Sequence, residues 1–181
     1  MDILNKKEAL EGYLKSLGSV LVAFSGGVDS TFLLKMAIDT LGNQNVEAFI
    51  AESPTYPVRE KEEAVTFCET QGISYKVLYT DEMNDEAFVK NDLNRCYYCK
   101  SHLYDEAIKY ARAKNLKFVV EGSNYDDLSD YRPGRKALGE KGILSPLLEV
   151  KLKKDEIRRL SKQLGLKTAD KPSFACLASR I

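Results

Sequence analysis

The clearest structural signal in this chain is Val20-Leu-Val-Ala-Phe-Ser-Gly-Gly-Val-Asp-Ser30. Its first half, Val20 to Phe24, is an uninterrupted apolar run, which is typical of a strand buried on both faces. Gly26 and Gly27 let the backbone turn sharply and approach a ligand closely. The residues from Ser30 onward have helical spacing, and the N–H groups at a helix start form an anion site. The stretch therefore predicts a strand, an anion-binding turn and a helix in direct succession.

Three side chains in this turn suit a polyphosphate ligand. Ser25 and Ser30 supply hydroxyl donors, and Asp29 can hold the divalent cation that accompanies a polyphosphate. The alternative is an ordinary strand–turn–helix unit whose glycines serve only packing. Because strand, glycine turn and helix occur in the order that an anion site needs, the ligand-binding interpretation is favoured.

The sequence on either side alternates between strand-like and helix-like segments. We predict strands over 46–51, 73–79, 118–122 and 143–148, and helices over 4–17, 30–41, 58–71, 103–113 and 153–164. Residues 81–94 are expected to form a short helix and a loop, and residues 123–142 a long loop. Such alternation predicts an α/β fold, a doubly wound, mainly parallel sheet with helices on both faces. Ligands of such sheets bind at the carboxyl ends of strands where the strand order reverses, here strands one, two and four.

Composition narrows the class of protein. The 181 residues suit one α/β domain. Lys plus Arg and Asp plus Glu are both 27, so the near-zero net charge gives no support for nucleic-acid binding. The sequence shows no signal peptide and no apolar run that could span a bilayer, which predicts a cytoplasmic protein with no membrane partner. In that reducing compartment, the four cysteines are better explained as ligands or reagents than as disulfides.

Three of the cysteines form a second candidate site. Cys96-Tyr-Tyr-Cys99 precedes a predicted helix, and Cys176 lies far downstream. Four interpretations compete: a zinc site completed by Cys68, a dithiol redox pair, buried structural cysteines, or a 4Fe–4S cluster held by three thiolates. Cys68 falls in the middle of a predicted helix on its packed face, which weakens the zinc interpretation. Spacing alone does not separate zinc from iron–sulfur.

Ser25-Gly-Gly-Val-Asp-Ser30 after a buried strand resembles the PP-loop of the ATP pyrophosphatases. That superfamily includes GMP and NAD synthetases, asparagine synthetase and tRNA-thiolating enzymes, which cleave ATP to AMP and pyrophosphate. The resemblance implies a PP-loop, Rossmann-like fold with ATP and Mg²⁺ as cofactors. The residues implied at the nucleotide are Ala23, Phe24, Ser25, Gly26, Gly27, Asp29, Ser30, Ser53 and Gly122. Of these, Ala23 and Ser53 are expected near the adenine and Gly122 near the ribose, with Asp29 on Mg²⁺ and Asp29 and Ser30 assisting catalysis.

Three further motifs narrow the resemblance. They are Arg95-Cys-Tyr-Tyr-Cys-Lys100, Asp130-Tyr-Arg-Pro-Gly134 and Cys176-Leu-Ala-Ser-Arg180. Together with the loop, they resemble the LarE family of ATP-dependent sulfur transferases across essentially the whole chain. Members of that family contribute to the nickel-pincer nucleotide cofactor of lactate racemase. They activate a carboxylate of a pyridinium-3,5-dicarboxylate mononucleotide as an acyl-adenylate and convert it into a thiocarboxylate.

The LarE family has two branches that differ in their cysteines. One branch has a single cysteine at the position of Cys176 and sacrifices its sulfur, whereas the other holds a 4Fe–4S cluster with three cysteines. This sequence has all three, so the resemblance implies that Cys96, Cys99 and Cys176 hold a 4Fe–4S cluster. Cys176 is then also expected at the centre of sulfur transfer. 

Four basic or hydroxyl side chains are candidates for the substrate phosphate or carboxylates: Lys100, Arg132, Ser179 and Arg180. Arginine suits bidentate contact with such groups. For Lys100 and Arg132, an ordinary solvated surface charge is nearly as good an explanation, whereas Ser179 and Arg180 belong to a family motif. The resemblance also implies a homo-oligomer at full length and a smaller C-terminal domain that lies beyond these 181 residues.

Two other functions use some of the same features. A PP-loop enzyme that thiolates tRNA would also carry three cysteines, but it predicts a basic face and flanking cysteine pairs that this sequence lacks. A non-catalytic ATP-binding module needs only the loop. Release of pyrophosphate from ATP separates an enzyme from such a module.

Overall fold

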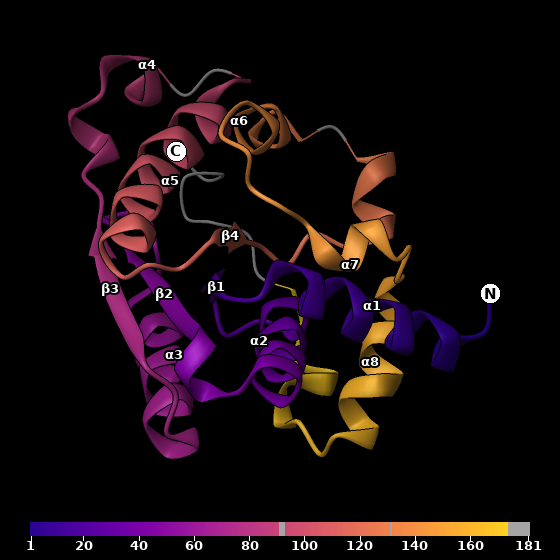
Figure 1. Cartoon of the computed structure of the whole chain (residues 1–181). Helices are drawn as coiled ribbons and strands as arrows, with labels where there is room; N and C mark the ends of the chain where they lie inside the picture. The colour runs from indigo at the N-terminus through magenta and orange to yellow at the C-terminus, as the bar shows by residue number, and fades with distance from the viewer. Residues whose placement is uncertain (91–92, 131, 174–181) are drawn as a thin grey trace.

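A computed structural model describes residues 1–90, 93–130 and 132–173 (Figure 1). Its centre is a parallel sheet whose strands are β1 (Val20–Ala23), β2 (Val46–Glu52), β3 (Tyr75–Tyr79) and β4 (Phe118–Val120). The strand order is β3-β2-β1-β4, and all three neighbouring pairs are parallel. The predicted parallel α/β sheet is confirmed.

The strand order reverses beside β1. The chain adds β2 and β3 on one side of β1 and then returns to place β4 on the other side. Val20 is in register with Val46 of β2 and with Phe118 of β4, so the three strands begin side by side and their carboxyl ends point to the same edge of the sheet. Their carboxyl ends form the crevice in which doubly wound sheets bind ligands.

Helices cover both faces of the sheet. They are α1 (Ile3–Leu17), α2 (Val28–Leu41), α3 (Val58–Gln71), α4 (Glu86–Val89), α5 (Arg95–Ala113), α6 (Gly134–Glu140), α7 (Pro146–Glu149) and α8 (Lys154–Gln163). Short 3₁₀ turns are η1 (Asn43–Asn45), η2 (Glu82–Asn84), η3 (Tyr125–Ser129) and η4 (Lys167–Asp170). Helices α1, α2, α3, α7 and α8 share a hydrophobic cluster with one face, and α5 and α6 share a cluster with the other.

Alternation along β1 explains the two clusters. Val20 and Val22 face the cluster around α2, whereas Leu21 faces the cluster around α5, and all three side chains are fully buried. An uninterrupted apolar strand is therefore required, because neither face meets water. Burying a side chain such as Phe32 or Phe49, both nearly inaccessible, contributes about 1.5–3 kcal/mol.

The structure differs from the sequence predictions in the second half of the chain. The interval 123–142, predicted as a loop, contains η3 and α6. The strand predicted over 143–148 is reduced to one parallel bridge between Leu144 and Val120, and α7 then begins at Pro146. Proline lacks a donor for the ladder and is well accommodated at a helix start, which explains why the strand does not continue.

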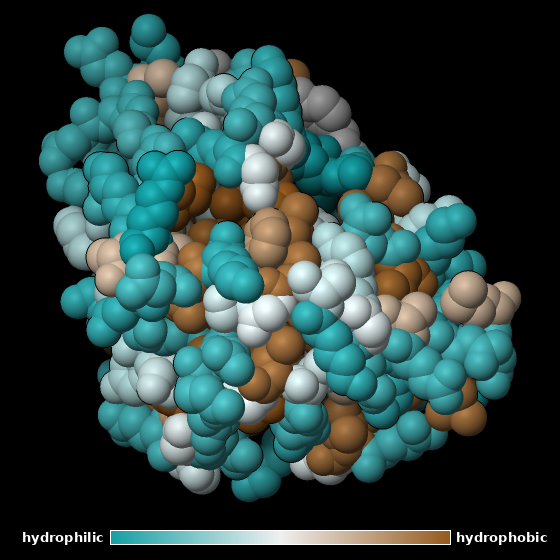
Figure 2. Space-filling view, in the orientation of Figure 1, coloured by the Kyte–Doolittle hydropathy of each residue, from teal (hydrophilic) through white to brown (hydrophobic). Residues whose placement is uncertain are grey.

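Polar residues dominate the surface. In Figure 2, hydrophilic residues cover most of the visible face, and hydrophobic residues show mainly in its centre, where β4 lies in Figure 1. None of the helices among the described residues has the length and apolar composition needed to cross a membrane.

Candidate nucleotide and cysteine site

The turn between β1 and α2 is held by its own two serines. The Ser25 and Ser30 hydroxyls lie 3.0 Å apart, and the Ser25 N–H donates to Ser30 Oγ at 3.2 Å. Gly26 adopts φ +78°, a left-handed conformation that favours glycine. The Phe24 N–H donates to the Phe49 carbonyl at 2.9 Å, which continues the β1–β2 pairing into the turn. The predicted strand, turn and helix are therefore confirmed in position and order.

The start of α2 is open to an anion. Its N-cap residue is Gly27, and no side chain of the described residues makes a capping hydrogen bond there. The first N–H groups of a 14-residue helix therefore point out of the turn together with the positive end of its dipole. This arrangement suits phosphate oxygens.

Asp29 is the most constrained acidic side chain of the turn. Its Oδ2 accepts from Asn124 Nδ2 at 3.0 Å and from Lys154 Nζ at 2.9 Å. Its Oδ1 is buried and has no hydrogen-bond partner among the residues that the structure describes. A buried carboxylate oxygen is costly to leave unpaired. The free Oδ1 therefore fits a ligand position for Mg²⁺, a hard cation that takes oxygen donors.

Gly122 lies against the backbone of the turn. A Cβ at this position would come within 3.1 Å of Ser30 N, 3.2 Å of Ser30 Cα and 3.3 Å of the Asp29 carbonyl carbon. The missing side chain thus allows the end of β4 to touch the first turn of α2. The predicted ribose contact of Gly122 is not tested by this packing and stays a prediction.

Ser53 follows β2 and lies beside the same turn. Its hydroxyl is 3.1 Å from Thr55 Oγ1, and Thr55 in turn donates to the buried Glu82 carboxylate at 2.6 Å. The Tyr56 hydroxyl, from the same segment, donates to the Ser25 carbonyl at 2.7 Å. The structure therefore brings together the predicted nucleotide residues Ala23 to Ser30, Ser53 and Gly122 at the carboxyl ends of β1, β2 and β4.

Sequence reasoning did not single out three partners of the turn. They are Asn124, Lys154 and Lys171. Asn124 lies in the interval that was predicted as a long loop, but Lys154 and Lys171 are 125 and 145 residues away from their partners in the turn. Only the folded sheet and α8 bring them there, so no local pattern could have found them.

Cys96 and Cys99 lie inside α5 rather than in a turn ahead of it, because the helix begins at Arg95. Their i, i+3 spacing places both thiols on one side of the helix. The α5 crossover runs from β3 back to β4, so its N-terminal end lies at the carboxyl edge of the sheet. The cysteine pair and the turn Ser25–Ser30 therefore occupy the same edge.

Tyr104 lies on α5, the helix that carries Cys96 and Cys99, and connects this helix to β4. Burial raises the pKa of Tyr104 well above its ordinary value, and the nearby charges of Glu121 and Cys99 add to the effect. Glu121 is itself buried and accepts from the Ser123 N–H at 3.1 Å and the Ser123 hydroxyl at 2.8 Å. Cys99 thus lies near the end of β4 that also carries Gly122.

Cys68 belongs to the core and not to the cysteine pair. It is fully buried in α3, and burial, with a smaller effect of Glu69, raises the pKa of its thiol to about 12. Among residues 1–90, 93–130 and 132–173, no three His, Cys, Asp or Glu side chains are grouped so that they could hold a metal. Cys68 therefore does not complete a zinc site. The zinc interpretation needed Cys68 as its fourth ligand, so the structure counts against it.

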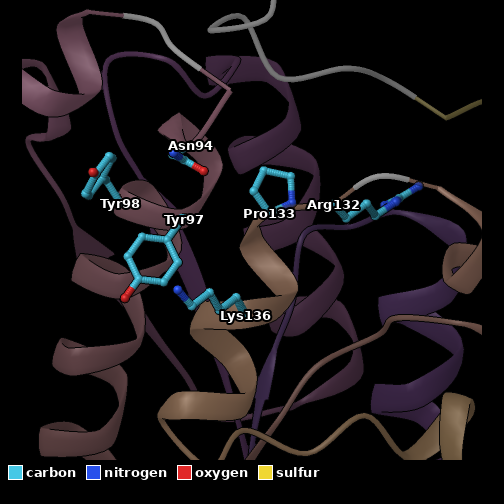
Figure 3. A pocket seen from close by; sticks show the side chains of 6 residues that line it. All are labelled: Asn94, Tyr97, Tyr98, Arg132, Pro133 and Lys136. Atoms are coloured by element: carbon cyan, nitrogen blue, oxygen red, sulfur yellow. The ribbon is translucent and has the colours of Figure 1, made fainter.

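A cavity of about 420 Å³ lies beside the cysteine pair, between α5 and α6. It is lined by Asn94, Tyr97, Tyr98, Arg132, Pro133 and Lys136. Figure 3 shows Tyr97 and Lys136 pointing toward each other, with Lys136 Nζ 5.6 Å from the centre of the Tyr97 ring. An ammonium at such a distance from an aromatic ring is attracted to the negative face of the ring.

Lys100 and Arg132, the two predicted substrate contacts that the structure describes, differ in their surroundings. The Lys100 side chain runs against Gly134, where a Cβ would come within 2.7 Å of Lys100 Cδ. Arg132 is half exposed and pairs with Asp127 at 2.9 Å and Asp130 at 3.2 Å, directed away from Tyr97 (Figure 3). Lys100 therefore lies at the α5–α6 contact beside the cysteines, whereas the charge of Arg132 is already compensated. Cys176, Ser179 and Arg180 lie outside the described residues.

The sheet, the turn and the open helix start define a nucleotide-binding α/β protein of the PP-loop type. A family model described as NAD synthase matches residues 3–123, and the chain belongs to this family. The fold is that of an NMN synthetase from Francisella tularensis, with a TM-score of 0.73 at 19% identity over 96% of this chain and 76% of that chain.

Two sequence relatives match nearly the whole chain. An uncharacterized protein of Synechocystis sp. is 43% identical over 97% of this chain, which spans 65% of that protein. The pyridinium-3,5-bisthiocarboxylic acid mononucleotide synthase of Lactiplantibacillus plantarum is 36% identical over 98% of this chain, which spans 64% of that protein. The second match supports the predicted membership of the LarE family.

Proposed function

We propose that this protein adenylates a carboxylate of a pyridinium dicarboxylate mononucleotide with ATP, releases pyrophosphate and converts the acyl-adenylate into a thiocarboxylate. Such a product is a step toward the nickel-pincer nucleotide cofactor of lactate racemase. The similarity to the Lactiplantibacillus plantarum synthase supports this substrate class. The observation that carries the proposal is the Asp29 carboxylate, fixed by Asn124 and Lys154 at the open start of α2 with one oxygen free.

The adenylation step uses the turn. A substrate carboxylate oxygen attacks the α-phosphorus of ATP, the bond to the β-phosphate oxygen breaks, and pyrophosphate leaves. The N–H groups at the start of α2 stabilise the charge on the departing pyrophosphate. The Lys154 ammonium, 2.9 Å from the Asp29 carboxylate, holds Asp29 in place beside them. Mg²⁺, when bound at Asp29 Oδ1, would supply further charge neutralisation.

The second step forms a carbon–sulfur bond. Attack of a sulfur nucleophile on the acyl carbon breaks the bond to the AMP oxygen, and AMP leaves. We assign the sulfur site to Cys96, Cys99 and Cys176. Two accessible thiols on one side of a helix start suit soft metal coordination, so the described pair fits a 4Fe–4S cluster. A cluster bound there would supply the sulfur atom.

The proposed substrate contacts are Lys100, Arg132, Ser179 and Arg180. The cavity of about 420 Å³ beside Lys100 has the size of small-ligand pockets, which range over about 300–1,000 Å³. Residues 1–181 are proposed to form the ATP pyrophosphatase domain of a cytoplasmic protein that assembles into homo-oligomers at full length.

Mass spectrometry of the reaction products tests this function. The protein, reconstituted with iron and sulfide, is incubated with ATP, Mg²⁺ and the pyridinium dicarboxylate mononucleotide. We expect AMP, pyrophosphate and a substrate in which one carboxylate oxygen is replaced by sulfur. Formation of ADP and phosphate instead would contradict the adenylation step. Sulfur incorporation into tRNA with none into the mononucleotide would contradict the proposed substrate class.

A further inference from the structure

Lys6 is a buried lysine that lies outside every motif of the sequence. It belongs to α1 and is 9% exposed. Its ammonium donates to both oxygens of the Glu156 carboxylate at 2.8 Å and to the Lys151 carbonyl at 2.9 Å. These partners follow it by 150 and 145 residues, and they lie where α7 gives way to α8, beside α1 (Figure 1). A lysine is rarely this buried unless it is paired, and here one ammonium fixes two points of a distant bend.

The bend between α7 and α8 has an unusual backbone. Lys151 adopts φ +58°, a left-handed conformation that favours glycine and is uncommon for other residues. The Lys6 ammonium donates to the carbonyl of this same residue. The hydrogen bond therefore supports a backbone conformation that a lysine does not itself favour.

Glu156 joins Lys6 to the first turn of α8. Its carboxylate accepts from Lys6 and, at 2.9 Å, from the N–H of Lys153, the N-cap residue of that helix. Burial acts to raise the pKa of Glu156, but the hydrogen bonds and charges of Lys6 and Lys153 outweigh it and hold that pKa below its ordinary value. Glu156 is therefore an ionised carboxylate at neutral pH that ties the start of α8 to α1.

Lys154, the first residue of α8, extends from this helix start to the turn Ser25–Ser30. Its N–H donates to the Asp126 carboxylate at 2.8 Å, and its ammonium donates to Asp29 Oδ2 at 2.9 Å. The position of the ammonium follows the position of the helix start that carries it. A shift of this helix start would therefore move a hydrogen-bond donor of Asp29.

We infer that Lys6 is a positioning residue for the Mg²⁺ and ATP site: it fixes the start of α8, so that Lys154 orients the Asp29 carboxylate with Oδ1 free. The inference rests on the proposed function, because it concerns the site that this function assigns to Asp29. Removal of a group that hydrogen-bonds to a metal ligand typically changes metal affinity about 10- to 100-fold. Lys154 is such a group, and Lys6 acts one step further away through Lys151 and Glu156.

A purely structural role for Lys6 is the competing explanation, because breaking a buried ion pair leaves one charge uncompensated. General destabilisation would weaken ATP binding equally with and without Mg²⁺. A displaced Asp29 carboxylate would instead weaken only the part of ATP binding to which Mg²⁺ contributes. The quantity that separates the two is the Mg²⁺ gain, the Kd for ATP without Mg²⁺ divided by the Kd with Mg²⁺.

The test uses variants of the full chain. Lys6→Met removes the ammonium and keeps most of the stem, Lys6→Arg keeps the charge, and Lys154→Met is made alone and together with Lys6→Met. Lys7→Met is the matched control, because Lys7 lies on the same helix and pairs within it, with Glu11 at 2.6 Å. Calorimetric Kd values for ATP with and without Mg²⁺ and the Tm are measured for each variant.

Lys154→Met is expected to lower the Mg²⁺ gain about tenfold, and Lys6→Met about three- to fivefold. The Kd for ATP without Mg²⁺ should stay within about twofold of wild type in Lys6→Met. On the Lys154→Met background, Lys6→Met should lower the Tm but change the gain less than about twofold, because its effect on Asp29 passes through Lys154. Lys6→Arg should recover the gain in part, and Lys7→Met should leave it unchanged.

An unchanged Mg²⁺ gain in Lys6→Met would overturn the inference, as would a full further loss of gain on the Lys154→Met background. If Lys6→Met does not fold, Lys6→Met combined with Glu156→Gln, which leaves no charge of the pair uncompensated, must show the reduced gain for the inference to stand.

Two results with the wild type separate the inference from the proposed function. ATP binding that does not respond to Mg²⁺ would overturn the inference together with the Mg²⁺ role of Asp29. A clear Mg²⁺ gain without any release of pyrophosphate would contradict the proposed function alone, since the variant series would still decide the role of Lys6.

Discussion

The turn Ser25–Ser30 and the cysteine pair lie at the same edge of the sheet but are built in opposite ways. In the turn, residues contiguous in sequence bond to one another, and Asp29 is fixed by two donors, Asn124 at the start of η3 and Lys154 of α8. The cysteine pair is carried by one helix, with Cys96 exposed, and its proposed third ligand comes from a distant segment. The turn is therefore organised before its ligand binds, whereas the cysteine site depends on what joins its separate parts.

Asp29→Ala breaks the turn at its most constrained side chain. We expect pyrophosphate release to fall by about a hundred- to a thousandfold, the loss typical when a charge-stabilising group is removed. Asp39→Ala is the matched control, because Asp39 lies on the same helix, is exposed and pairs with Lys35 one turn away. Undiminished pyrophosphate release by Asp29→Ala, measured with a coupled pyrophosphate assay, would refute the assignment of the turn.

Replacement of the cysteines tests the other half of the comparison. After anaerobic reconstitution with iron and sulfide, we expect Cys96→Ala and Cys99→Ala to lose the visible absorption of the cluster. Cys68→Ala should keep it, because Cys68 is buried in the core on α3. Pyrophosphate release should persist in all three variants. A cluster that survives in Cys96→Ala, judged by iron and sulfide analysis, would be incompatible with the proposed ligands.

Gly122→Ala probes how tightly the turn is fixed by its neighbours. The added Cβ would meet backbone atoms of Ser30 at 3.1 and 3.2 Å. Because backbone cannot rotate away, Asp29 and Ser30 must shift, and we expect the KM for ATP to rise about tenfold. Gly139→Ala is the control, since a Cβ there meets nothing within 4 Å and alanine is favoured over glycine in a helix by about 1 kcal/mol. Equal KM values for the two variants would disprove the close contact.

Cys68 gives the smallest effect and separates a core cysteine from the site cysteines. Its folded pKa of about 12 lies above the value of about 8.5 for an unfolded thiol. Its contribution to stability is therefore complete below about pH 8.5 and declines as pH rises toward 12. Relative to Cys68→Ala, wild type should lose under about 1 kcal/mol of unfolding free energy between pH 7 and pH 9. Urea titrations at both pH values that show a gain instead would contradict its burial as a neutral thiol.

The sequence predicted the turn well because everything that shapes it is local. The apolar run before Ser25 and the left-handed Gly26 are readable within a few residues. The start of α5 was missed because clear helical periodicity begins only at Leu103, whereas tertiary packing against α4 and α6 extends the helix back to Arg95. Lys154 and Lys171 were missed for a different reason. Their partners lie more than a hundred residues away, so only the folded layers reveal them.

The measurement that tests the central claim most directly is the exchange of labelled pyrophosphate into ATP. With Mg²⁺ and the pyridinium dicarboxylate mononucleotide present, adenylation at Asp29 and the α2 start predicts rapid exchange that disappears without the mononucleotide and in Asp29→Ala. This result requires no sulfur source, so it examines the turn alone. Absence of exchange by a folded protein that binds Mg·ATP, or exchange that persists in Asp29→Ala, would contradict the account.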